Sequence, residues 1–154
     1  KENKSFITVM PTNLYGPNDN YDNFSSHVLA ALIKKIHLAK VNNLEKVTLF
    51  GDGSPLREFL YVEDAAEAII KILNKPFKKS IINIGSSKEI SILDLAKLIA
   101  KVIGCDTKFV FDKNKPNGTP RKLLDSTQMN KIGWKSKTTL QKGIKLAYQD
   151  FLQN

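Results

Sequence analysis

Two histidines and one cysteine, His27, His37 and Cys105, are the side chains of this chain best suited to proton exchange or nucleophilic attack near neutral pH. A single cysteine excludes a disulfide within the chain and a cysteine-based metal site. Two histidines form a zinc site only with added carboxylates, and no spacing in the sequence supplies a metal-ligand motif. We therefore predict no metal.

Three loops combine residue types that are more specialised than a simple connection requires. Pro11–Pro17 (PTNLYGP) follows an apolar, strand-like segment, where α/β sheets bind their ligands. In Gly51–Phe59 (GDGSPLREF), a Gly-x-Gly pair allows close backbone approach to a ligand, and Arg57 follows. Lys115–Lys122 (KPNGTPRK) places basic residues around a Gly-Thr-Pro bend, which suits phosphate oxygens.

Each loop also has a structural interpretation. Taken alone, the first is better explained as a simple turn. The second is also consistent with a hairpin turn whose Arg57 pairs with Glu58, and the third is equally consistent with a solvated loop. The two arginines of the chain, Arg57 and Arg121, both lie in these loops, which favours a doubly anionic ligand.

The elements that must position these loops alternate between strand and helix patterns. Apolar, β-branched runs predict strands at 5–10 (buried), 46–50, 57–62, 81–84 and 108–111. Apolar residues spaced by three and four predict helices at 27–40, 63–73, 92–103, 127–132 and from 139 onward. The segments 11–23 and 113–122 are predicted as loops. This alternation indicates an α/β fold with parallel or mixed sheet.

Helix boundaries are predicted from capping residues. We expect Ser25 or Ser26 to cap the first helix, Pro76 to end the second, and Gly104 to end the third. Two capping boxes are predicted in addition, Ser91 with Asp94 and Thr138 with Gln141.

The charge and the hydrophobic content of the chain bear on which classes of protein it could belong to. The chain has 154 residues and a net charge of +9, but all except two of its 24 basic residues are lysines. Lysine without aromatic interleaving is typical of a solvated surface, so nucleic-acid binding is a minor alternative. Hydrophobic residues make up 42% of the chain, as in an ordinary globular domain. No apolar run reaches the ~20 residues of a membrane span and no signal peptide is visible, so we expect a cytoplasmic protein.

Four stretches together resemble the GDP-L-fucose synthase family of extended short-chain dehydrogenases, which act on nucleotide sugars. They are VMPTNLYGPNDNYDNFSSHV, LFGDGSPLREFLYVEDAAEAI, NIGSSKEISILDLAKLIAKVIG and FDKNKPNGTPRKLLDSTQMNKIGW. The YGP, GxGxxxREF and NIG elements occur across many sugar-nucleotide epimerases and reductases. The PTNLYGPxDN…SHV and KPxGTPRKLLD elements are more specific to the GDP-sugar branch.

The resemblance covers the whole chain but only the carboxyl-terminal half of the family. It implies the last Rossmann strand or strands plus a smaller mixed α/β substrate-binding domain, with 1–154 as this single unit. No Gly-rich dinucleotide motif and no Tyr-x-x-x-Lys occur in the sequence. We expect both, with the family's catalytic serine and cysteine, upstream of Lys1, and we expect the chain alone to be inactive.

The implied activity is the NADP-dependent conversion of GDP-4-keto-6-deoxy-D-mannose to GDP-L-fucose, by 3,5-epimerisation and 4-reduction. Carried over residue by residue, the resemblance makes His27, in the SHV motif, a catalytic acid–base and a cofactor contact. It also implies that NADPH lies against Pro11, Thr12, Asn13 and Leu14. Cys105 lies in the wrong segment of the chain to match the catalytic cysteine of the family. His37 is expected to be a surface or packing residue.

The resemblance implies substrate binding by Lys35, Phe50, Arg57, Asn117 and Lys122, with Arg57 on the nucleotide diphosphate. Three of these depart from the family pattern: relatives carry arginine at Lys35, tryptophan at Phe50 and aspartate at Asn117. A homodimer is implied for the full-length protein.

Two alternatives stay open. The protein reduces or epimerises another GDP-deoxysugar, such as a deoxyheptose, or it is a non-catalytic module that binds nucleotide sugars.

Overall fold

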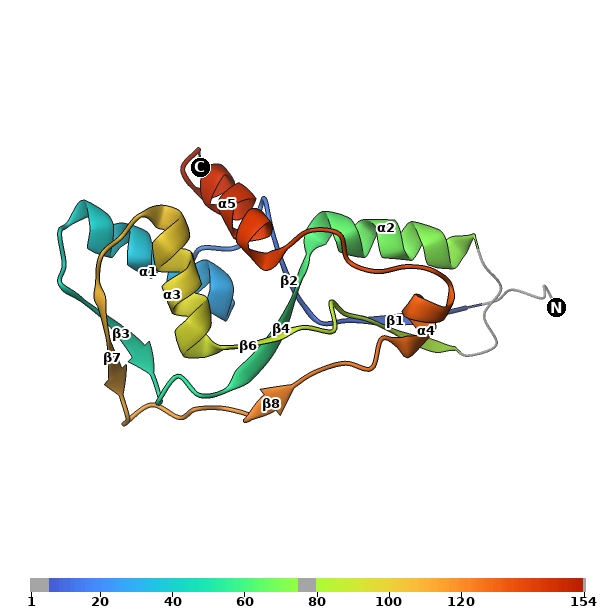
Figure 1. Ribbon diagram of the computed structural model, residues 1–154, viewed down its shortest axis with the longest axis horizontal. Helices are drawn as coiled ribbons and strands as arrows, with labels where there is room; N and C mark the ends of the chain where they lie inside the picture. Colours follow the sequence, from blue (N-terminus) through green and yellow to red (C-terminus); the bar gives the residue numbers. More distant parts are fainter. Residues whose placement is uncertain (1–5, 75–79, 154) are drawn as a thin grey trace.

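The computed structural model describes residues 6–74 and 80–153 and shows a mixed α/β fold that is longer than it is wide (Figure 1). Ser5 and Pro76, which belong to two sequence predictions, lie outside the described residues. The strands are β1 (Thr8–Pro11), β2 (Asn13–Tyr15), β3 (Lys46–Phe50), β4 (Leu56–Tyr61), β5 (Ile81–Ile84), β6 (Glu89–Ser91), β7 (Lys108–Asp112) and β8 (Arg121–Lys122). The helices are α1 (Val28–Val41), α2 (Val62–Leu73), α3 (Ile92–Ile103), α4 (Thr127–Lys131) and α5 (Leu140–Phe151).

Strand pairing is mostly parallel, which confirms the predicted class. The parallel pairs are β1 with β5, β2 with β4, β4 with β8, and β3 with β7, whereas β4 and β6 are antiparallel. The central strand is β4, because its second half pairs with β2 and its first half with β6 and β8. It runs between the two ends of the molecule (Figure 1).

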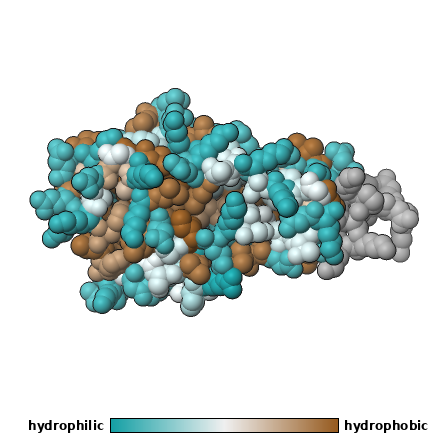
Figure 2. All heavy atoms as spheres, viewed as in Figure 1, coloured by the Kyte–Doolittle hydropathy of each residue, from teal (hydrophilic) through white to brown (hydrophobic). Residues whose placement is uncertain are grey.

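Each end of the molecule has its own apolar core. At one end, α1, α3 and α5 pack with β3 through buried side chains that include Ile33, Ile36 and Ile99. At the other end, α2 and α4 pack on β5, with Ile82 and Trp134 buried between them. Figure 2 shows apolar atoms exposed on the face in view, mostly over the end that holds α1 and α3, among polar side chains. Within the described residues, no helix is both long and apolar enough to cross a membrane.

The boundaries of α3 confirm their prediction. The hydroxyl of Ser91 accepts the backbone N–H of Asp94 at 3.0 Å and donates to the Asp94 carboxylate at 2.7 Å. Gly104 ends the helix in the left-handed conformation, with φ of 69°, which glycine adopts without strain.

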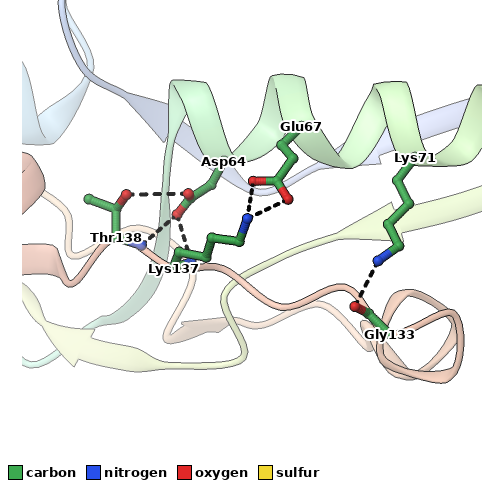
Figure 3. Close-up of polar contacts among 6 residues, drawn as sticks. All are labelled: Asp64, Glu67, Lys71, Gly133, Lys137 and Thr138. Carbon is green, nitrogen blue, oxygen red and sulfur yellow. Dashed lines mark hydrogen bonds and ion pairs between the residues drawn. The ribbon is translucent and has the colours of Figure 1, made fainter.

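A buried carboxylate at the start of α2 explains why one cap prediction is wrong. Asp64 is 6% exposed and accepts the backbone N–H groups of Lys137 and Thr138, at 3.1 and 2.9 Å, and the Thr138 hydroxyl at 3.2 Å (Figure 3). Because Asp64 engages Thr138, the next residue, Thr139, caps α5 through a bond from the Lys142 N–H.

The middle and the carboxyl-terminal end of α2 contact the same carboxyl-terminal stretch of the chain. The Lys137 ammonium pairs with Glu67 at 2.7 Å, and the Lys71 ammonium donates to the Gly133 carbonyl at 2.8 Å (Figure 3).

Four further predictions about the elements are wrong. The predicted loop 11–23 contains β2, and the loop 113–122 ends in β8. His27, rather than Ser25 or Ser26, is the N-cap of α1, and its side chain makes no capping bond. The first strand was expected to be buried, but one face of β1 is open among the described residues: Thr8 and Met10 are exposed, Met10 by 50%, whereas Val9 between them is partly buried.

Candidate active site

The first cavity contains every residue for which the resemblance implied a cofactor contact. It has a volume of about 670 Å³ and is lined by Pro11, Thr12, Asn13, Leu14, His27, Arg121, Lys122, Leu123 and Leu124. One wall runs from the end of β1 to the start of β2, and the opposite wall is β8 with the residues after it. Because β1, β2 and β8 are paired with β5 or β4, the sheets hold both walls.

The first wall is fixed by hydrogen bonds to β4 and β5. The Thr12 backbone N–H donates to the Ile84 carbonyl at 3.0 Å. The Thr12 hydroxyl and the Asn13 amide both donate to the Glu58 carbonyl, at 3.2 and 2.7 Å. The polar groups of both side chains are therefore engaged by the protein, although Asn13 is exposed and Leu14 is 37% exposed.

His27 stands at the first turn of α1, where the helix meets the first cavity. Its carbonyl accepts the Ala31 N–H at 2.9 Å, so the backbone already behaves as a helix start. The imidazole is exposed and lines the cavity. A solvent-accessible imidazole beside a cavity can take up or release a proton at a bound molecule.

The other two candidates for proton chemistry lie elsewhere. The Nδ1 atom of His37 is 3.0 Å from the Tyr148 hydroxyl, and its ring packs on Tyr148 and Phe151, so it is a packing residue as predicted. Cys105 is partly buried after α3, and burial raises the pKa of its thiol. It lines neither of the cavities described in this section.

Arg121 pairs with a carboxylate of the protein itself. The expectation that both arginines bind a doubly anionic ligand is therefore weaker for Arg121 than for Arg57. The guanidinium of Arg121 forms two hydrogen bonds of 2.7 Å to the Glu89 carboxylate. The pair joins β8 to β6 and lowers the pKa of Glu89, because the bonds and the charge of Arg121 favour the carboxylate. Lys122 is exposed beside it.

A second cavity gathers four of the five residues for which substrate binding was implied. It has a volume of about 430 Å³, and Lys35, Phe50, Arg57 and Asn117 all line it. The fifth residue, Lys122, lines the first cavity instead.

The two cavities adjoin at two places. Ser26 and Val28 line the second cavity while His27 between them lines the first. Arg57 of the second cavity is also in register with Lys122 of the first across β4 and β8.

Phe50 is the aromatic centre of the second cavity. Its ring is 61% exposed, and the ammonium groups of Lys35 and Lys115 lie 5.0 and 5.8 Å from its centroid. Lys35 also donates to the Thr48 carbonyl at 2.9 Å, and burial lowers its pKa. An exposed ring with cations beside it suits a flat heterocycle that carries phosphate.

Arg57 and Asn117 are both partly engaged by the protein. The Arg57 Nη1 donates to the Leu56 carbonyl at 2.7 Å, which leaves further donors of the guanidinium. The Asn117 amide oxygen accepts the Asp52 N–H at 2.7 Å, so only one of its lone pairs remains for a ligand.

Two residues of the site were missed by the sequence reasoning. Phe24 lines the second cavity and is 98% exposed, on a loop held by bonds to the Asp22 carboxylate from the backbone N–H groups of Phe24 and Ser25. An aromatic residue inside the polar stretch 18–26 was the available signal. Glu58 is completely buried and does not pair with Arg57, because neighbouring residues of a strand point to opposite faces.

Three comparisons with known proteins show what this chain is similar to. The family model described as NAD dependent epimerase/dehydratase family matches residues 1–85. A GDP-L-fucose synthase of Sinorhizobium fredii is 47% identical over 97% of this chain and 48% of its own length. The chain spans about half the length of the curated relatives it matches.

Solved structures are similar over the same extent. A GDP-L-fucose synthetase from Naegleria fowleri bound to NADP is 32% identical, with a TM-score of 0.87, and the match covers 97% of this chain and 47% of that one. A GDP-6-OMe-4-keto-L-xylo-heptose reductase from Campylobacter jejuni is 29% identical, with a TM-score of 0.88, over 100% of this chain and 56% of that one.

Proposed function

Because this chain belongs to the NAD dependent epimerase/dehydratase family, we propose that it is the substrate-binding, carboxyl-terminal half of an enzyme that converts GDP-4-keto-6-deoxy-D-mannose to GDP-L-fucose. One observation carries the proposal. Residues implied by the resemblance come from segments as far apart as Pro11 and Lys122, and they line two adjoining cavities. A GDP-L-fucose synthase that is 47% identical over almost the whole chain supports the same activity.

The exposure of β1 and β5 supports the view that this chain is one half of the enzyme. Parallel strands are normally covered on both faces, yet Met10 is 50% and Ile81 58% exposed. In the proposal, the rest of the enzyme extends this sheet and supplies the Gly-rich motif, the Tyr-x-x-x-Lys and the second proton-transfer group.

The first cavity suits the nicotinamide end of a cofactor. Pro11 and Leu14 offer exposed apolar surface to a flat ring, and Lys122 offers positive charge. When bound, the cofactor supplies the hydride that reduces the ketone. We propose NADPH rather than NADH on the basis of the resemblance and of the NADP bound to the Naegleria fowleri relative.

In this proposal, His27 exchanges protons at the sugar. Epimerisation beside a ketone needs a base that removes a proton from one face of the carbon and an acid that returns a proton to the other. The imidazole of His27, exposed in the first cavity, is suited to one of these roles. The second group comes from outside this chain, because Cys105 lines neither cavity.

The second cavity is proposed to hold the nucleotide. Arg57 binds the diphosphate with its remaining guanidinium donors, and the Phe50 ring stacks on the base while Lys35 adds positive charge. Asn117 accepts at most one hydrogen bond from guanine through its free lone pair. Lys122, at the junction of the cavities, contacts the sugar or phosphate side of the substrate.

A second candidate is the reduction of another GDP-sugar, such as a deoxyheptose. The Campylobacter jejuni heptose reductase, with a TM-score of 0.88, favours it. A cytoplasmic homodimer is part of either proposal and rests on the resemblance.

A product assay separates these functions. The complete protein that contains this chain is incubated with NADPH and either GDP-4-keto-6-deoxymannose or a GDP-4-keto-heptose, and the products are identified by NMR. We expect GDP-L-fucose from the first substrate. Turnover of the heptose alone would establish the second candidate, and binding of GDP-sugars without turnover would establish a non-catalytic module.

A further inference from the structure

Glu58 is a buried acidic residue to which neither the resemblance nor the comparisons give a role. Its side chain is 0% exposed and lies in β4, next in sequence to Arg57 of the second cavity. Burial of a carboxylate is costly unless hydrogen bonds compensate for the lost hydration, so the bonds that Glu58 makes indicate why it is there.

The side chain of Glu58 reaches two separate segments. One carboxylate oxygen accepts the Ser87 N–H at 2.6 Å, in the turn between β5 and β6. The other accepts the Leu124 N–H at 3.1 Å, in the segment between β8 and α4. Leu124 is part of one wall of the first cavity.

The backbone of Glu58 holds the opposite wall. Its carbonyl accepts the Thr12 hydroxyl and the Asn13 amide, at 3.2 and 2.7 Å. A single residue therefore bonds to both walls of the first cavity, through its carbonyl on one side and its carboxylate on the other. Glu58 itself does not line the cavity.

Gly85 leaves the space that this carboxylate occupies. A Cβ atom at position 85 would clash with one carboxylate oxygen of Glu58 and lie 2.9 Å from the other. Gly85 has no positive φ, so its replacement by alanine would disturb the carboxylate by contact rather than by backbone strain.

We propose that Glu58 is a positioning residue that sets the separation of the two walls of the first cavity, and thereby the affinity of that cavity for a nicotinamide cofactor. The inference rests on the proposed function in that it takes the first cavity to be the cofactor site. A carboxylate is required because two N–H groups donate to two different oxygens, whereas glutamine offers one oxygen and an NH₂ group that repels the second donor.

The test uses the complete protein with Glu58→Gln and, as an independent disturbance of the same carboxylate, Gly85→Ala. We expect each to weaken NADPH binding by about 10-fold, the loss typical of one charge-assisted hydrogen bond, while GDP affinity in the second cavity changes less than about 2-fold. Because both act on one group, the double variant should be no weaker than about the poorer single variant. Glu67→Gln is the matched control, since the contact that Glu67 of α2 makes among the described residues is an exposed ion pair with Lys137.

Amide hydrogen exchange on the cofactor-free protein gives a readout that does not depend on turnover. In Glu58→Gln, the amides of Ser87 and Leu124 should exchange faster, whereas those of α1 should not change. A variant that binds GDP with wild-type affinity is taken to be folded.

Unchanged NADPH affinity in folded Glu58→Gln and Gly85→Ala would overturn the inference, as would an equal loss of NADPH and GDP affinity, which is the result of general destabilisation. Failure of the proposed function looks different: the wild-type protein would then bind NADPH without forming GDP-L-fucose. A wild-type protein that binds no NADPH would overturn both.

Discussion

His27 is the N-cap residue of α1, but its side chain makes no capping hydrogen bond. Its side chain can therefore be replaced without removing a bond that stabilises the helix. Asparagine is a favourable N-cap, so His27→Asn should leave the helix intact while removing the imidazole that is proposed to exchange protons. We expect kcat to fall at least ~100-fold with GDP affinity unchanged. Stopped-flow NADPH oxidation and GDP titration measure these two quantities.

His37→Asn is the control for that substitution. It removes the contact with Tyr148 and should lower thermal stability without a comparable loss of kcat in the folded protein. A His27→Asn variant that keeps wild-type kcat would exclude His27 from proton transfer.

The two arginines provide a second matched pair. Arg57 lines the second cavity with free donors, whereas Arg121 is bonded to Glu89 and lines the first. Arg57→Lys keeps the charge but loses the planar fork, and should weaken GDP binding about 10-fold. Arg121→Lys should leave GDP affinity within about 2-fold. Calorimetric titration with GDP checks both, and equal losses would contradict the assignment of the nucleotide to the second cavity.

At the scale of elements, the attachment of α2 to the carboxyl-terminal segment depends on Asp64. Asp64→Asn leaves a weaker acceptor for the N–H groups of Lys137 and Thr138 and should destabilise the fold by about 1.5–3 kcal/mol. The comparison is Glu67→Gln, which removes an exposed ion pair and should cost less than about 1 kcal/mol. Urea unfolding measures both, and a smaller effect at Asp64 would count against this role.

The pair between β6 and β8 predicts a pH dependence. Because the bond from Arg121 lowers the pKa of Glu89 in the folded protein, its stabilisation is present above the usual carboxyl pKa and is lost as the pH falls through the lowered value. Glu89→Gln should therefore lower the melting temperature at pH 7, and this difference should shrink as the pH falls below 4.5, the usual carboxyl pKa, and through the lowered value. A constant difference across this range, measured by scanning calorimetry, would show that the ion pair is not its source.

Local signals were enough to predict most elements. The spacing of apolar residues located α1, α3 and α5, and Gly104 and the Ser91–Asp94 pair located the ends of α3. Long-range contacts decided the rest: β2, β6 and β8 have two or three residues each and exist because β4 pairs with them. The cap of α5 shifted to Thr139 because Asp64, far away in sequence, binds Thr138.

The site could be predicted in part. Motif resemblance selected residues that the fold does bring together, but the division into two cavities, with Lys122 in the first, depends on how β8 lies beside β4. Phe24 was missed although an aromatic residue in a polar stretch was a signal, because the cavity that it lines depends on the shape of a loop. Glu58 was missed because its burial has no local sequence signature.

At the scale of the whole molecule, the two ends of the elongated fold have two different roles in the proposal: one supports nucleotide binding and the other contacts the rest of the enzyme. The end with α1, α3 and α5 supports the nucleotide cavity, and β1 and β5 at the other end present open strand surface to the remainder of the enzyme (Figure 1). The first cavity, with His27, lies where the substrate sugar and the nicotinamide would meet.

Isotope exchange by the complete protein tests this account most directly. GDP-4-keto-6-deoxymannose and NADPH are incubated in D₂O, and the sugar product is analysed by NMR. The account predicts GDP-L-fucose with deuterium at both carbons beside the former ketone in the wild type, and greatly reduced deuterium incorporation in His27→Asn. A reduced sugar with no deuterium at these carbons, or no reduced sugar at all, would contradict it.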